Sequence, residues 1–193
     1  MSRNLRWVGW SVPGCLAVLA LCATVVSTAE KTGERFTAAA INLDRGAAGN
    51  IEIEVNRWSS NADRKRLMDV AINKGPDKLL EVLQKLPRVG YFRTPDKLGW
   101  DLHYAYRTPG EDGGERIVLI TDRRIGFWEA VNQPRTIDYP FTVIEMRLNR
   151  DGDGEGKMSI ATKVIVDKDK NTITLENYGL SPVMLNHIRR ERS

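Results

Sequence analysis

The side chains best suited to chemistry gather in one segment, residues 121–141, which reads TDRRIGFWEAVNQPRTIDYPF. The segment lies between two strand patterns but has neither a strand nor a helix period itself. Connections longer than about 12 to 15 residues are typically lids, binding loops or disordered segments, and the aromatic content here argues against disorder. We therefore expect an ordered loop. With one histidine from outside the loop, the candidate ligand-binding residues are Arg123, Arg124, Trp128, Glu129, Arg135, Asp138, Tyr139 and His103.

Three interpretations fit this set. The loop can be a structural plug, in which Trp128 caps the core and Arg135 pairs with Asp138 or Glu129. It can be one wall of a ligand pocket, where arginines offer forked donors to an anionic head group and Trp128 covers an apolar body. It can also supply Glu129 and Asp138 as an acid and a base beside His103 or Tyr139, as glycan hydrolysis requires of two carboxylates.

No stronger catalytic or metal motif occurs in the sequence. There is no G-x-S-x-G nucleophile elbow and no H-E-x-x-H zinc pattern. The stretch NRDGDGEGKMSI spaces Asn149, Asp151 and Asp153 like a calcium loop, but Ile160 stands at the twelfth position, where such a loop needs Glu. We interpret it as a solvated turn. We predict no catalytic residue, no metal and no cofactor, and an enzyme is the less favoured class.

The N-terminus has the pattern of a secretory signal peptide. Two arginines precede a short apolar core, and the small residues Ser27 and Ala29 occupy the positions that signal peptidase reads. We predict residues 1–29 as the signal peptide and 30–193 as a single β-rich domain. Lipidation is the weaker alternative, because Cys15 lies near the start of the apolar core and Cys22 follows a leucine. The expected location is the periplasm or the outside medium.

Composition limits the possible partners. The leader holds both cysteines, so the mature domain would be cysteine-free and stabilised by packing. The formal net charge of +4 falls by the two arginines of the leader, and its signs are interspersed, which does not indicate a nucleic-acid partner. We expect a small molecule or an envelope protein as partner and no transmembrane segment in the mature chain. The ending IRRERS is expected to be a solvated tail.

Strand patterns dominate the predicted domain. FTAAAINL and NIEIEVNRW predict a hairpin in which Ile51, Ile53 and Val55 face the core while Glu52 and Glu54 face water. About seven to nine strands are expected in all. The others are VGYFRT, WDLHYAYRT, ERIVLIT, FTVIEMRLN, KMSIATKVIVD, NTITLENYG and PVMLNHIRRE.

The pattern WDLHYAYRT predicts one continuous strand. Trp100, Leu102, Tyr104 and Tyr106 then share one face of it. On the other face, His103 is expected either to be exposed or to line a polar cavity.

Two helices interrupt the strands. Ser60, with Asp63 three residues later, predicts a capping box for a helix that ends at Gly75, and DKLLEVLQKL predicts a second helix with its leucines on one stripe. ERIVLIT is apolar on both faces, as expected of a strand that the helical hairpin covers on one side. The predicted fold class is α+β, mostly β: an antiparallel meander, either a curved sheet or a small barrel, with one helical hairpin inserted after the second strand.

The runs LPRVGYFRT, TDRRIGFWEAVNQPRTIDYPFT and LENYG resemble an uncharacterised family of exported bacterial proteins. The resemblance covers most of the predicted mature chain. It implies an envelope or secreted location and brings no activity and no functional residue. The chain is thus predicted to be an exported binding module that holds a small amphiphilic or anionic molecule under the 121–141 loop. An envelope interaction or structural module and a carboxylate-based hydrolase are the alternatives.

Overall fold

The computed structural model describes residues 33–42, 46–95, 99–110, 113–122, 141–167, 172–177 and 181–191. They belong to one compact unit, Lys31–Ser193. The predicted signal peptide lies outside the described residues and stays a prediction. Within the described part of the chain, no helix is both long and apolar enough to cross a membrane.

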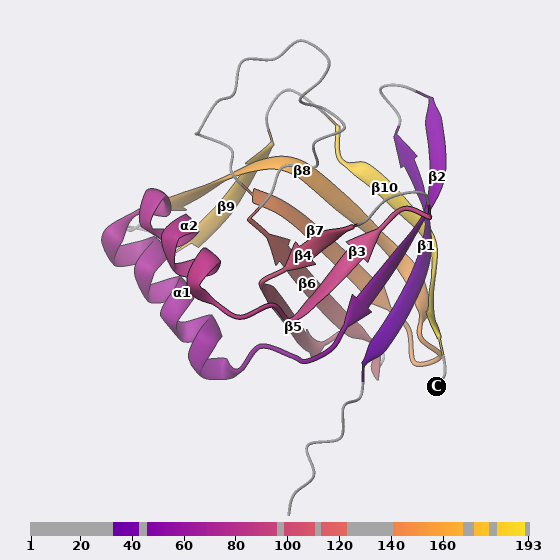
Figure 1. The fold of residues 1–193 in the computed structure, drawn as a ribbon, viewed down its shortest axis with the longest axis horizontal. Helices are drawn as coiled ribbons and strands as arrows, with labels where there is room; N and C mark the ends of the chain where they lie inside the picture. Colours follow the sequence, from indigo (N-terminus) through magenta and orange to yellow (C-terminus); the bar gives the residue numbers. More distant parts are fainter. Residues whose placement is uncertain are drawn as a thin grey trace, which may run out of the picture. The chain divides into compact units, whose positions relative to one another are not determined.

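The described residues form ten strands and two helices (Figure 1). In chain order they are β1 (Glu34–Asn42), β2 (Ala47–Val55), α1 (Asn61–Lys74), α2 (Pro76–Lys85), β3 (Gly90–Arg93), β4 (Trp100–Leu102), β5 (Tyr104–Pro109), β6 (Glu115–Thr121), β7 (Phe141–Leu148), β8 (Asp153–Asp167), β9 (Thr172–Asn177) and β10 (Val183–Glu191). This confirms the predicted class: α+β, mostly β, with a helical hairpin after the second strand.

One antiparallel sheet contains all the strands. Its order is β4-β3-β2-β1-β10-β8-β7-β6-β5, and β9 pairs with β8 beside this path. The sheet is not closed, so the structure confirms the curved-sheet alternative of the prediction and not the small barrel. The strands at the two ends of this order, β4 and β5, are consecutive in the chain and are separated only by His103.

The inner face of the curved sheet holds the main core. Side chains from β1, β2, β3, β4, β6, β7, β8 and β10 share one buried cluster, which includes the predicted inward row of Ile51, Ile53 and Val55. Burying each large apolar side chain contributes about 1.5–3 kcal/mol. The largest fully buried members are Phe36, Ile53, Phe92, Leu102, Ile117, Leu119, Ile144, Met146, Leu185 and Ile188.

A second core lies on the opposite face of the same strands, under the helices. Along β6, Ile117 and Leu119 belong to the inner cluster, while Val118 and Ile120 pack against the cluster that contains Leu83 of α2. The strand is therefore apolar on both faces because each face is covered, as the sequence predicted. Figure 1 shows the two helices side by side along one flank of the sheet.

Local signals set the bounds of the helices. The Ser60 side chain accepts a hydrogen bond from the Asp63 backbone N–H, and the Asp63 carboxylate accepts one from the Ser60 backbone N–H, which confirms the predicted capping box. Gly75 separates the helices with a φ of 89°, a left-handed conformation that side chains disfavour. Pro76 then begins α2, where its missing N–H costs no helical hydrogen bond.

The prediction of one continuous strand in WDLHYAYRT is wrong. Trp100 and Leu102 belong to the inner core, whereas Tyr104 and Tyr106 belong to the outer one. The chain bends at His103, and its pairing partner changes there from β3 to β6. The two-residue alternation of side chains does not continue through the bend, because His103 is not part of the ladder with β3 or of the ladder with β6. Side chains at even-numbered positions therefore face the inner core before His103 and the outer core after it. The same break brings the strand count to ten within the described residues.

The expectation of a solvated C-terminal tail is also wrong for residues 188–191. They complete β10, which pairs with both β1 and β8, and Ile188 is fully buried. The Arg190 guanidinium lies between two carboxylates: its Nε is 3.2 Å from Glu34 Oε2, and its Nη2 donates to Glu115 Oε1. The basic C-terminal segment is part of the sheet because Arg190 pairs with carboxylates on other strands.

Candidate ligand-binding groove

Most of the predicted ligand-binding residues lie outside the described residues. They are Arg123, Arg124, Trp128, Glu129, Arg135, Asp138 and Tyr139. The plug, pocket-wall and acid–base interpretations of the 121–141 loop therefore stay predictions.

His103, the remaining predicted site residue, lies at the joint between β4 and β5. Its side chain is 18% exposed, so the exposed alternative of the prediction does not hold. Its Nδ1 lies 3.0 Å from the Leu86 carbonyl oxygen, which can only accept, and its Nε2 lies 3.6 Å from Asp122 Oδ1. Both ring nitrogens thus face groups of the fold, and His103 ties the end of α2 to the end of β6.

The calcium-like stretch forms a turn, as predicted. Asn149 Oδ1 accepts hydrogen bonds from the backbone N–H groups of Asp151 and Asp153, at 2.9 and 3.1 Å. This is the local turn bonding typical of Asn. Gly152, with a φ of 86°, completes the reversal between β7 and β8.

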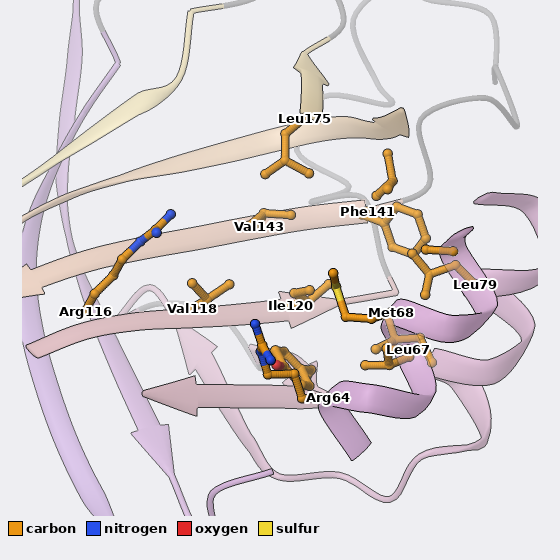
Figure 2. A pocket seen from close by; sticks show the side chains of 14 residues that line it. Arg64, Leu67, Met68, Leu79, Arg116, Val118, Ile120, Phe141, Val143 and Leu175 are labelled. Atoms are coloured by element: carbon orange, nitrogen blue, oxygen red, sulfur yellow. The ribbon is translucent and has the colours of Figure 1, made fainter. Parts of the chain in front are cut away.

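A mostly apolar groove lies between the helical hairpin and the outer face of the sheet (Figure 2). Its volume is about 310 Å³. Side chains of α1, α2 and strands β5 to β9 line it, and they are mostly apolar. They are Arg64, Leu67, Met68, Ala71, Leu79, Leu83, Tyr104, Arg116, Val118, Ile120, Phe141, Val143, Val164 and Leu175.

Helical spacing creates one wall of the groove. Arg64, Leu67, Met68 and Ala71 of α1 lie at positions i, i+3, i+4 and i+7, which form one face of a helix. The first of the four is charged and the other three are apolar. This wall therefore runs from a polar end at the start of α1 to an apolar end one to two turns later.

Strand alternation creates the opposite wall. Arg116, Val118 and Ile120 of β6 follow one another at every second residue, so they share the outer face. Phe141 and Val143 form a similar row on β7. The β6 wall also begins with an arginine and continues with apolar residues. In Figure 2, Arg116 lies at one end of the groove and Leu79 and Phe141 lie toward the other, while Arg64 projects from the start of α1 nearer the middle of the view.

The two arginines keep unused donors. Arg116 Nε donates to Glu145 Oε1 at 3.1 Å, and its two terminal nitrogens make no hydrogen bond within the described part of the chain. The Arg64 guanidinium lies 5.5 Å from the centre of the Tyr106 ring and makes no ion pair with a described carboxylate. Guanidinium groups of this kind can bind an oxyanion.

Tyr104 adds a neutral hydroxyl to the groove. The residue is 7% exposed, and its ring stacks on Tyr106 with 6.0 Å between the centres. Burial raises the pKa of Tyr104 to about 12, although the nearby Arg64 charge acts in the opposite direction. The hydroxyl is therefore protonated at neutral pH. Among the described residues it has no hydrogen-bond partner, so it is available as a donor.

Sequence reasoning missed Arg64, Arg116 and Tyr104 as site residues. The signals were present: an arginine begins the apolar row of α1, and another begins the outer row of ERIVLIT. The two arginines belong to one site because the helical hairpin lies over β6, and the sequence alone does not give that placement. Tyr104 was assigned to the wrong face because the break at His103 was not recognised.

Comparisons of this chain with family models, curated proteins and solved structures found no match. The function is therefore inferred from the geometry of the groove.

Proposed function

We propose that this protein is an exported binding module that holds a small amphiphilic molecule in the groove between the helical hairpin and the sheet. The observation that carries the proposal is a hollow of about 310 Å³ with apolar walls and two arginines in its lining. Export rests on the leader pattern and on the family resemblance.

The size and lining of the groove favour a ligand of modest size. Ligand pockets usually span about 300–1,000 Å³, with apolar walls and a few polar groups that orient the ligand. This groove lies at the small end of that range, which suits a single chain or one ring system. Apolar surface that stays in contact with water also costs about 25 cal/mol of free energy per Å² of exposed area. A ligand that covers these walls recovers that free energy.

The proposal keeps the predicted class of ligand and assigns it to a site that the structure describes. Ile120 and Phe141 lie next to or within the ends of the 121–141 loop, and both line the groove. The loop residues outside the described part are not needed for the argument. The 14 described lining residues include no Asp or Glu, and the acid–base interpretation of Glu129 and Asp138 stays a separate prediction.

Equilibrium binding of a neutral apolar fluorophore, such as N-phenylnaphthylamine, tests the proposal. Val118→Phe places a larger ring in the groove on a half-buried strand position. Thr37→Phe is the matched control, because Thr37 is also half-buried but belongs to β1, away from the groove. We expect saturable one-to-one binding that Val118→Phe weakens by about tenfold or more, equivalent to about 1.4 kcal/mol, while Thr37→Phe leaves it unchanged.

Circular dichroism would show that both variants are folded. Equal binding by the wild type and the folded Val118→Phe variant would contradict the proposal, as would the absence of saturable binding.

A protein-interaction module is the second candidate, and one observation favours it. Ile165 and Leu175 are 41% and 42% exposed on the β8–β9 hairpin, and β9 pairs only with β8 among the described strands. Exposed apolar side chains on an edge strand are typical of docking surfaces. Ile165 does not line the groove, so Ile165→Lys separates the two functions. Loss of a co-purifying envelope protein, with fluorophore binding intact, would support docking at this hairpin.

A further inference from the structure

We infer that the ligand of this groove carries an oxyanion head group, a carboxylate or a phosphate ester, bound by the arginines of the lining, Arg64 and Arg116. The inference rests on the proposed function, because it specifies the chemistry of a ligand held in the same groove. Its basis is that two guanidinium groups and one tyrosine hydroxyl are the polar side-chain groups in the described lining of an otherwise apolar site.

Two independent elements each contribute one positive charge to the groove. Arg64 belongs to the first turn of α1, and Arg116 is the second residue of β6. From each arginine, the lining continues only with apolar side chains along that element. A single-chain amphiphile fits this arrangement with its head at the arginines and its tail toward Leu79 and Phe141 (Figure 2).

The local charge balance favours an anion over a cation. Glu145 is the acidic partner of Arg116, but Arg147 Nη2 and Lys157 Nζ also lie 3.7 and 3.6 Å from its carboxylate. Glu145 thus faces three cations, with Glu155 beside the same group, and Arg64 adds a positive charge to the groove lining that Asp63 partly offsets near Tyr104. The resulting positive potential attracts an oxyanion and repels an ammonium head group.

Glu145 is a positioning residue for the head-group site. Its carboxylate is 12% exposed and accepts from Arg116 Nε, which leaves the two terminal nitrogens of that guanidinium for the ligand. Arginine binds an oxyanion through two parallel donors when its plane is fixed in this way. The Tyr104 hydroxyl can supply a further, neutral donor.

Isothermal titration of ten-carbon probes tests the inference. The probes are decanoate, decyl phosphate, decanol and decylammonium, all below their micellar concentrations. The test variant is Arg64→Gln/Arg116→Gln, and Arg35→Gln/Arg93→Gln is the control. The control removes the same charge from the outer face of β1 and β3.

We expect the wild type to bind an anionic probe at least about tenfold more tightly than decanol, equivalent to about 1.4 kcal/mol. The test variant should lose this preference and still bind decanol, while the control keeps it. A preference for decanoate assigns the head group as a carboxylate, and a preference for decyl phosphate assigns it as a phosphate ester.

Two results would overturn the inference while leaving the proposed function intact: equal binding of decanol and both anions, or an anion preference that survives in the test variant. If the wild type binds none of the four probes, the proposed function fails together with the inference.

Discussion

Tyr104 shows how a single residue takes its properties from its surroundings. It is an ordinary tyrosine in the sequence, but the structure buries it between the outer face of β5 and the helical hairpin, in the cluster that contains Leu67 and Leu83. Burial disfavours the phenolate, which raises the pKa of Tyr104 to about 12. A neutral donor in an apolar wall is useful for orienting a ligand and is insensitive to pH in the physiological range.

Alkaline titration of the wild type and Tyr104→Phe tests this environment. The difference in tyrosinate absorbance between the two proteins should report one group with a midpoint near pH 12. Because the folded state holds this proton more tightly than the unfolded state, unfolding free energy falls as the pH rises from about 10 to 12. Tyr104→Phe should lose less stability over that window. A difference midpoint near the ordinary tyrosine value would contradict the described burial.

Among the elements, the pair β7–β8 depends on a glycine. A side chain at Gly154 would meet the carbonyl oxygen of Arg147 on the neighbouring strand, which is backbone and cannot turn away. At Gly49 of β2, by contrast, a Cβ atom would meet nothing within 4 Å. The two glycines look alike in the sequence, but only the first is required by close approach of the strands.

Gly154→Ala should therefore destabilise the protein by about 1–3 kcal/mol, the usual cost of overpacking. Gly49→Ala should be neutral or should stabilise the protein by up to about 1 kcal/mol, because it reduces the freedom of the unfolded chain. Chemical denaturation of both variants gives the comparison. Equal loss of stability in the two would show that the β7–β8 contact is less close than described.

The elements also show where periodicity is informative. The hairpin β1–β2, the capped helix α1 and the double-sided strand β6 were predictable because each follows one local rule along its length. The strand WDLHYAYRT was not, because its alternation continues in the sequence across a bend that only tertiary pairing reveals. The predicted set of site residues had the same limit: it was chosen from one loop, whereas the groove combines rows from α1 and β6.

At the scale of the whole molecule, an ion-pair cluster connects strands from both halves of the chain. Glu34 of β1 accepts from Trp58 Nε1 at 2.9 Å and from Arg107 Nη1 of β5 at 3.0 Å, while Arg190 of β10 joins Glu34 to Glu115 of β6. The sequence separation of these residues is large, so no local pattern predicts the cluster. It explains why the basic C-terminal segment is part of the fold.

Arg190→Met should cost about 1–3 kcal/mol of unfolding free energy, because it leaves the carboxylates of Glu34 and Glu115, each about 20% exposed, without this partner. The methionine retains apolar contact with Phe36, over whose ring the guanidinium lies. Arg35→Met, which removes an arginine from an exposed pair with Glu54, is the control and should have a smaller effect. Equal effects in thermal denaturation would argue against a structural role of the cluster.

The central claim is that a ligand binds to the outer face of the sheet, under the helical hairpin. Methyl NMR during titration with decanoate tests it most directly, because adjacent residues on two strands face opposite sides. Val118 and Val143 line the groove, whereas their neighbours Leu119 and Ile144 belong to the inner core. We predict saturable shifts of the Val118 and Val143 methyl signals with little change at Leu119 and Ile144. Shifts confined to the inner pair, or none at either pair, would contradict the claim.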